Sequence, residues 1–201
     1  MPIALTEIPA PVVPSDPPRK RWTRAECAAL EAAGLLRQER LELVEGELIG
    51  KMGKKRPHVS SFTVLQAWLM QVFGWRFVNS EAPIDVAPED NPTNEPEPDV
   101  IVLQQDQSSF TSNPRPPDLR LVVVADSSLG FDLKVKAALY ARAGIVEYWV
   151  LDVTGRRSLV HRNPVSGMYA DVAAYSEHES VSPLAAPQAQ FRVADAFQAT
   201  A

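Results

Sequence analysis

The chain has 201 residues, with 20 Lys and Arg against 25 Asp and Glu, so its formal net charge is −5. Its apolar fraction of 45% is ordinary for a single globular domain with a real core. The acidic balance argues against a protein whose main task is tight, non-specific binding of duplex DNA, because such domains are usually basic. Cys27 is the only cysteine, which excludes an intrachain disulfide and a zinc site built from several cysteines of one chain.

The N-terminal segment has no features of a targeting sequence. It lacks a basic n-region and an apolar h-region. No stretch of the chain reaches the roughly 18 consecutive apolar residues that a membrane span needs. We therefore expect a cytoplasmic protein without a membrane partner. Residues 1–20 contain six prolines and are expected to form a disordered or draped tail, with one folded domain at 21–201.

The first elements of the folded domain are predicted to be a helix and a hairpin. Thr23 and Glu26 have the spacing of a capping box, which predicts a helix over about 23–36. Apolar residues on both sides of a Glu-Gly pair predict a β-hairpin over 41–49.

The middle of the chain predicts a further helix and two buried strands. The helix is expected from about residue 57 to 73, and it is apolar on most sides, so it should pack against more than one neighbour. The runs P-D-V-I-V-L at 98–103 and D-L-R-L-V-V-V-A at 118–125 are apolar on both faces. This pattern is typical of the central strands of a covered sheet.

The C-terminal third continues the alternation of helix and strand. We expect a helix over 130–143, a core strand over 147–153 and a second strand paired with it across a Thr-Gly turn. A further strand and a short closing helix complete the chain. This order predicts an α/β fold, with a mixed central sheet flanked by helices and an N-terminal helix and hairpin. Tyr148 and Trp149 are neighbours on the core strand and point to opposite faces, so either core packing or a dimer seam explains them.

Asp99, which opens the first buried strand, is one candidate for chemistry. Metal-dependent hydrolysis of a phosphodiester needs carboxylate oxygens on rigid elements, and a nearby lysine stabilises charge on the phosphate. An aspartate that only begins a strand after a turn explains the same spacing equally well. Lys136 is a second candidate, because it shares one face of a predicted helix with Asp132 and Tyr140. An exposed ion pair with Asp132 is the commoner explanation of that pattern.

A basic loop precedes the helix that begins near residue 57. Basic side chains next to a helix N-terminus form a plausible surface for holding phosphate, although a solvated loop is the commoner origin of such a run. No other histidine lies at metal-ligand spacing from His58, so a zinc site is not favoured. The chain has no P-loop, dinucleotide-binding or G-x-S-x-G motif. The residues of this candidate surface are Lys51, Lys54, Lys55, Arg56 and His58.

Several segments together resemble one known family. The segments E-L-V-E-G-E-L, R-P-H-V-S-S-F, E-P-D-V-I-V-L and the run from Asp126 to Asp152 are similar to the Uma-two family of restriction-endonuclease-like proteins, in the PD-(D/E)xK nuclease superfamily. The run from Asp126 is the most specific of them, and the resemblance extends over about residues 22–198. It implies a restriction-endonuclease-like fold, the activity of a metal-dependent DNA endonuclease, and Mg²⁺ or Mn²⁺ as the cofactor.

The resemblance also implies roles for single residues. Asp99 matches the strand aspartate of the family and is expected to bind the metal. Lys136 matches a lysine that has moved from the strand into the following helix. Polar positions that border the family's site match Glu45, Glu47 and His58. The residues expected to act in catalysis are Asp99, Lys136 and Glu47, and those expected to bind substrate are Lys54, Lys55, Arg56 and His58.

One position departs from the family. The family's usual L-V-V-E-V-x-D-S-S places a second catalytic glutamate at residue 123, where this chain has Val123. Asp126 is a poor substitute, because strand positions an odd number apart face opposite sides. We therefore expect a metal-dependent DNA endonuclease with impaired activity. The alternative is a catalytically degenerate protein that keeps the fold as a binding or assembly module, and the expected partners are DNA and a second copy of the chain.

Overall fold

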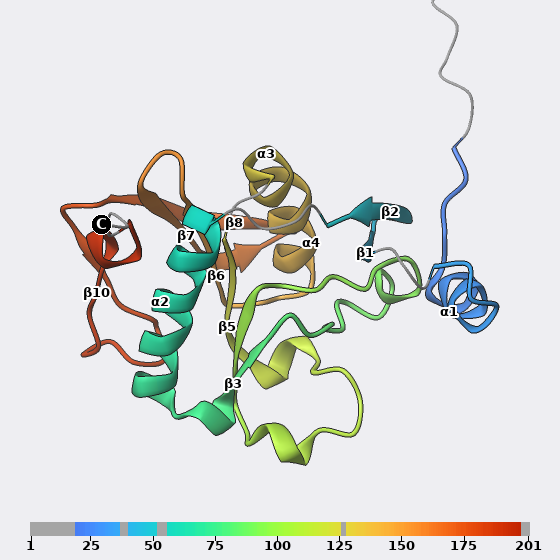
Figure 1. Cartoon of the computed structure of the whole chain (residues 1–201), viewed down its shortest axis with the longest axis horizontal. Coiled ribbons are helices and arrows are strands. Elements are labelled where there is room, and N and C mark those ends of the chain that lie inside the picture. Colours follow the sequence, from blue (N-terminus) through green and yellow to red (C-terminus); the bar gives the residue numbers. More distant parts are fainter. Residues whose placement is uncertain (1–18, 37–39, 52–55, 126–127, 198–201) are drawn as a thin grey trace, which may run out of the picture.

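The computed structural model describes residues 19–36, 40–51, 56–125 and 128–197. Its centre is a six-stranded sheet in the order β3-β4-β5-β6-β7-β8. Helix α2 (Arg56–Phe73) covers one face, and α3 (Leu129–Phe131) and α4 (Ala137–Arg142) cover the other (Figure 1). The predicted α/β fold with a mixed sheet is confirmed. The strands of the sheet are β3 (Val78–Ser80), β4 (Val100–Leu103), β5 (Leu119–Ala125), β6 (Glu147–Asp152), β7 (Arg157–Val165) and β8 (Met168–Ser176).

The sheet is mixed because of a single parallel pair. Strands β5 and β6 are parallel and are joined by the crossover that contains α3 and α4, whereas the other neighbouring strands are antiparallel. A parallel pair needs a crossover of this kind, since a tight turn reverses the chain. The register places Val123 opposite Val100 on β4 and opposite Trp149 on β6. These three side chains therefore share one face of the sheet.

Two apolar clusters fill the spaces between the sheet and its helices. On the α2 face, Leu65 of the helix packs in a cluster with Val123 and Trp149. On the opposite face, Val124 and Tyr148 belong to the cluster beneath α4. The predicted opposite orientation of Tyr148 and Trp149 is thus confirmed, and their exposures of 0% and 1% make both of them core residues. Neither side chain is available for a dimer seam.

The N-terminal helix begins where the capping box predicts. In α1 (Arg24–Ala32) the hydroxyl of Thr23 accepts a hydrogen bond from the N–H of Glu26 at 3.3 Å, and the carboxylate of Glu26 accepts one from the N–H of Thr23 at 3.0 Å. The helix ends before residue 36 because Gly34 adopts a left-handed φ of +78°. The predicted Pro-rich tail falls largely on residues 1–18, which lie outside the described residues.

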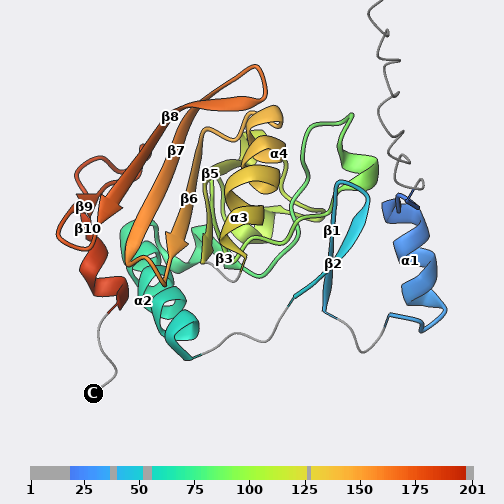
Figure 2. The same cartoon turned by 90° about the horizontal axis from the view of Figure 1, so that it is seen from above.

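The predicted hairpin is formed by β1 (Leu41–Val44) and β2 (Glu47–Gly50), and it lies between α1 and the sheet (Figure 2). Its turn needs two left-handed residues, with φ of +51° at Glu45 and +74° at Gly46. A Cβ atom at Gly46 would lie 2.9 Å from Cβ of Arg21, so only glycine fits there. The turn therefore sets the register that places Glu42 opposite Ile49.

The C-terminal segment closes the α2 side of the sheet. Strands β9 (Ser180–Val181) and β10 (Phe191–Arg192) form a small antiparallel pair. The predicted closing helix is a 3₁₀ turn at Val193–Phe197. The rings of Trp68 on α2 and Phe191 are 5.1 Å apart between centroids. Within the described ranges, no helix has both the length and the apolar character needed to cross a membrane.

Candidate active site

A polar cavity of about 260 Å³ lies at the ends of β4 and β5, where the hairpin, the first turn of α2 and the start of the crossover meet. The residues that line it come from segments far apart in the sequence, so the cavity forms only when the chain folds. The cavity has carboxylates from Glu42, Glu81, Glu97, Asp99 and Asp132, and basic side chains from Arg40, Lys51, His58 and Lys136.

Lys136 is the most buried cation of the cavity. Its Nζ lies 2.7 Å from Oε1 of Glu42 and 3.6 Å from Oδ1 of Asp132. The three side chains are 7%, 6% and 4% exposed, respectively. The ion pair predicted between Asp132 and Lys136 therefore exists, but it is buried and shared with Glu42 rather than exposed. Glu42 lies in the hairpin and was not among the residues predicted for the site. The one feature of the sequence that could have indicated it is a glutamate between two leucines in an otherwise apolar strand.

The charge state of Lys136 follows from its surroundings. Burial by itself lowers the pKa of a lysine, but the carboxylates of Glu42, Asp132 and Asp99 together outweigh burial and raise the pKa of Lys136 above its ordinary value. The side chain is therefore a fixed ammonium near neutral pH. It cannot act as a general base, but it can stabilise negative charge on a bound group.

Asp99 is held by the main chain of the neighbouring strand. Its Oδ2 accepts a hydrogen bond from the N–H of Ala125 at 2.7 Å, and its carbonyl oxygen accepts one from the N–H of Glu81 at 3.1 Å. Glu42 is fixed in a similar way, because its Oε2 accepts a hydrogen bond from the N–H of Glu97 at 3.1 Å. Both carboxylates are thus oriented by backbone groups of rigid segments.

The crossover helix departs from the predicted continuous α-helix. The five residues Asp132–Lys136 form a π-helical segment between α3 and α4. A π turn closes its hydrogen bonds between residues i and i+5, and such turns are frequent at functional sites. Here the two ends of the segment, Asp132 and Lys136, are both buried and both line the cavity.

Comparison with known proteins shows a family and a fold for the chain. The family model described as "Uma2: Putative restriction endonuclease" matches residues 25–194. The chain belongs to the Uma2 family. It is also similar to a crystal structure described as "a putative nuclease belonging to DUF820" from Anabaena variabilis ATCC 29413, with 14% sequence identity, a TM-score of 0.62, and coverage of 80% of this chain and 90% of that one. At this identity the likeness shows the fold alone, and no curated protein matches the chain.

The structure brings together three of the residues that the Uma2 resemblance implied. Asp99, Lys136 and His58 all line the cavity. Glu47 does not, and its side chain is 53% exposed and 3.8 Å from Arg19. The hairpin register accounts for this placement, because Glu47 lies at the turn end of β2 and Glu42 takes the position beside the cavity. Arg56 is exposed and outside the cavity lining, and Lys54 and Lys55 lie outside the described residues.

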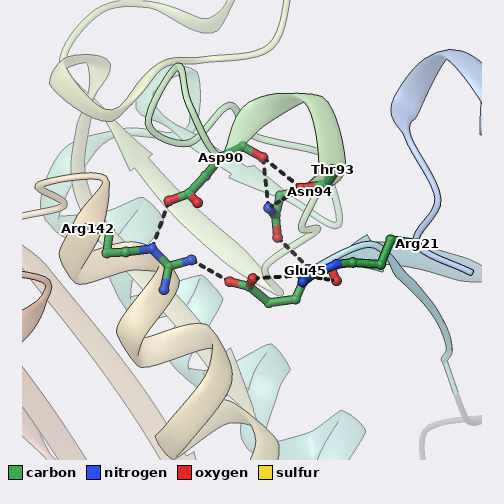
Figure 3. Close-up of polar contacts among 6 residues, drawn as sticks. All are labelled: Arg21, Glu45, Asp90, Thr93, Asn94 and Arg142. Atoms are coloured by element: carbon green, nitrogen blue, oxygen red, sulfur yellow. Dashed lines mark hydrogen bonds and ion pairs between the residues drawn. The ribbon is translucent and has the colours of Figure 1, made fainter. Parts of the chain in front are cut away.

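Glu45, a further position that the Uma2 resemblance marked, has a structural partner elsewhere. Its carboxylate pairs with Arg142 of α4, and the same guanidinium donates to Asp90 at 2.8 Å (Figure 3). The N–H of Glu45 donates to Oδ1 of Asn94 at 2.6 Å. These contacts fasten the hairpin turn to α4 and to the loop before β4. Glu45 thereby holds the strand that carries Glu42.

Residue 123 lies on the α2 face of β5 and does not line the cavity. Val123 is 1% exposed and packs in the cluster beneath α2, whereas Val124 and Ala125 line the cavity. The Uma2 resemblance implied that the missing carboxylate belongs at residue 123. In this structure Val124, rather than Val123, lines the cavity with Asp99 and Lys136.

The donor set fits the expected Mg²⁺ or Mn²⁺ only in part. Carboxylates such as Asp99 and Glu42 are the hard oxygen donors that these ions prefer. However, among the residues that the structure describes, no three His, Cys, Asp or Glu side chains are grouped so that they could hold a metal ion. Glu42 is already paired with the ammonium of Lys136. The described residues therefore offer only part of a ligand set for either ion.

Proposed function

We propose that the chain is a DNA endonuclease of the restriction-endonuclease type in which hydrolysis of phosphodiester bonds is impaired. The observation that carries the proposal is a single cavity that contains Asp99, Glu42 and the protonated Lys136. Membership of the Uma2 family supports the reaction class. Because one fold hosts many functions, the cavity is a stronger argument than the sheet.

The residues of the cavity divide into two roles in this proposal. Lys136 stabilises negative charge on the phosphoryl oxygens, since its raised pKa keeps it protonated. Asp99 is the residue assigned to Mg²⁺ or Mn²⁺. Among the described residues, no group of three His, Cys, Asp or Glu side chains could hold such an ion, and this is the expected cause of the impairment.

Contacts to DNA are proposed for the basic run in the sequence that leads into α2. His58 lies in the first turn of α2, an 18-residue helix whose N-terminal N–H groups favour a phosphate. The adjacent basic residues Lys54, Lys55 and Arg56 are proposed to contact the DNA backbone. Such contacts position the duplex and carry no sequence information.

Replacing Asp99 by asparagine tests the proposed reaction. We expect the unmodified chain to nick supercoiled plasmid slowly with Mn²⁺, and Asp99→Asn to lower that rate at least about tenfold, or 1.4 kcal/mol in activation free energy. Asparagine keeps an oxygen that can accept from the N–H of Ala125, so the loss would report the charge rather than the fold. Glu89→Gln, an exposed position outside the cavity, is the matched control. Equal rates for the chain and for Asp99→Asn would refute the assignment.

Binding of the metal gives a second test that does not depend on cutting. An ion that binds only the folded state raises the melting temperature. We expect Mn²⁺ to raise it by about 2–4 °C, which corresponds to roughly 1 kcal/mol for a domain of this size. The rise should vanish in Asp99→Asn and persist in Glu89→Gln. A rise of the same size in both variants would place the ion somewhere else on the chain.

A second candidate function is a binding or assembly module that no longer cuts. The observation in its favour is the apolar wall that Val124 and Ala125 contribute beside Asp99. This candidate predicts DNA binding, or self-association alone, with no nicking of plasmid by any variant that keeps residues 123 and 124 as valine. The plasmid assay with the unmodified chain therefore separates the two candidates.

A further inference from the structure

The outer edge of β8 has unused hydrogen-bonding capacity. β8 (Met168–Ser176) pairs along its length with β7 and forms one border of the sheet (Figure 2). Within the described residues, no backbone hydrogen bond joins Met168–Tyr175 to any segment other than β7. In an antiparallel pair, alternate residues point their N–H and C=O groups away from the partner strand. A row of such groups therefore faces outward from β8.

The sequence of β8 does not protect this edge. Natural edge strands are usually short, or carry lysine, proline or inward-pointing charge that prevents pairing with another strand. β8 has nine residues, M-Y-A-D-V-A-A-Y-S, with Asp171 as its single charge. Residues 170–174 are all exposed. The opposite border of the sheet, β3, has only three residues. β8 is therefore long enough to pair with another strand, whereas β3 has the short length that is usual for a protected edge.

Exposed apolar side chains accompany the free edge. Met168, Val172 and Val165 are 68%, 56% and 52% exposed, and the register places Val165 beside Met168. A largely apolar hollow of about 460 Å³ lies next to them, between β7, β8 and the crossover helix. Contiguous exposed apolar surface of this kind marks an interaction site.

We propose that β8 pairs with β8 of a second copy of this chain, antiparallel and about a two-fold axis, so that the six-stranded sheets of two chains become continuous. Antiparallel pairing of one strand with its own copy satisfies two-fold symmetry, the commonest symmetry of protein dimers. The charge pattern permits this partner. With the axis at Val172, Asp171 faces Ala173 of the second copy, and the two carboxylates are not directly opposite each other.

The proposed interface leaves the candidate active site open. No residue of β8 lines the cavity around Lys136. The inference therefore stands whether or not the chain cuts DNA, and its test does not use cleavage. It also identifies a surface for the expected homodimer, which Tyr148 and Trp149 cannot provide because they are buried.

Sedimentation of the full chain over a range of concentrations tests the dimer. We expect a monomer–dimer equilibrium whose dissociation constant rises at least about tenfold in Val172→Lys, a change of 1.4 kcal/mol. Val64→Lys, at an exposed valine on α2, is the matched control and should leave the constant unchanged. A chain that stays monomeric at every concentration, or a dimer that Val172→Lys does not weaken, would overturn the proposal.

Crosslinking locates the pairing independently of stability. Cys27 is the only cysteine, so a Cys27→Ala background carries no thiol, and single cysteines can be placed at each position from 170 to 174. Opposite residues of an antiparallel pair have Cα atoms about 4.5–5.5 Å apart, within reach of a disulfide. We expect oxidation to give most crosslinked dimer at Val172→Cys and less on either side. A maximum within 170–174 supports edge pairing, whereas a dimer that no position crosslinks would exclude it.

Discussion

Replacing Lys136 by methionine is expected to lower the free energy of unfolding by about 3–5 kcal/mol, the range for removing one partner of a buried ion pair. The substitution keeps much of the side-chain volume but leaves the carboxylates of Glu42 and Asp132 buried without their cation. Urea unfolding followed by circular dichroism measures the change. Lys134→Met, at an exposed position in the same helical segment, is the matched control and should change stability little.

The double variant Lys136→Met/Glu42→Gln tests the cause of that loss. Because it also removes the uncompensated charge of Glu42, we expect it to be more stable than Lys136→Met alone. If Lys136→Met unfolds with the stability of the Lys134→Met control, the ammonium does not hold these carboxylates together and its assigned role is wrong.

The pH dependence of stability provides another readout of Lys136. Its pKa is raised by the surrounding carboxylates despite burial, and burial raises the pKa of Tyr140 and Tyr148 well above their ordinary 10.0. A group whose pKa is raised on folding contributes stability that is fully present below its unfolded pKa and is lost as the pH rises through its folded pKa. We expect stability to decline above about pH 10. Lys136→Met should remove the lysine's share of that decline and leave the tyrosines' share.

Introducing glutamate at residue 123 is expected to lower the free energy of unfolding by more than about 3 kcal/mol. The new side chain would place an ionised carboxylate among the apolar side chains beneath α2. A glutamate at residue 124 would line the cavity that also contains the ammonium of Lys136. We therefore expect a smaller loss of unfolding free energy for Val124→Glu than for Val123→Glu. Urea unfolding of Val123→Glu and Val124→Glu measures the difference directly.

Plasmid nicking with Mn²⁺ by the same two variants shows which position completes the carboxylate set. We expect Val124→Glu to increase the rate and Val123→Glu to leave it unchanged or lower it. The opposite result, with Val123→Glu stable and faster, would mean that a long side chain at 123 reaches the cavity around the strand end. The position implied by the Uma2 resemblance would then be the right one.

Much of the fold could be predicted from local patterns in the sequence. The capping box of Thr23 and Glu26, the Glu-Gly turn of the hairpin and the two strands apolar on both faces depend on neighbouring residues. Short-range hydrogen bonds and alternating burial determine such features, so they can be read without knowing the rest of the chain. Asp99 and Lys136 could be predicted as site residues from the sequence. Asp99 begins a buried strand, Lys136 shares a helix face with Asp132, and both match positions of the Uma2 family.

The composition of the cavity was decided only by the tertiary structure. The hairpin contains three glutamates, and their local sequences do not show which one would meet Lys136. Packing of the hairpin turn against α4, through Glu45 and Arg142, accompanies the placement of Glu42 beside Lys136, whereas Glu47, at the turn end of β2, is exposed. The π turn that brings Asp132 and Lys136 into the cavity, and the side of β5 on which Val123 lies, likewise depend on contacts between distant segments. Sequence patterns indicate which apolar residues are buried, whereas long-range packing determines which charged residues are buried and which of them face one another.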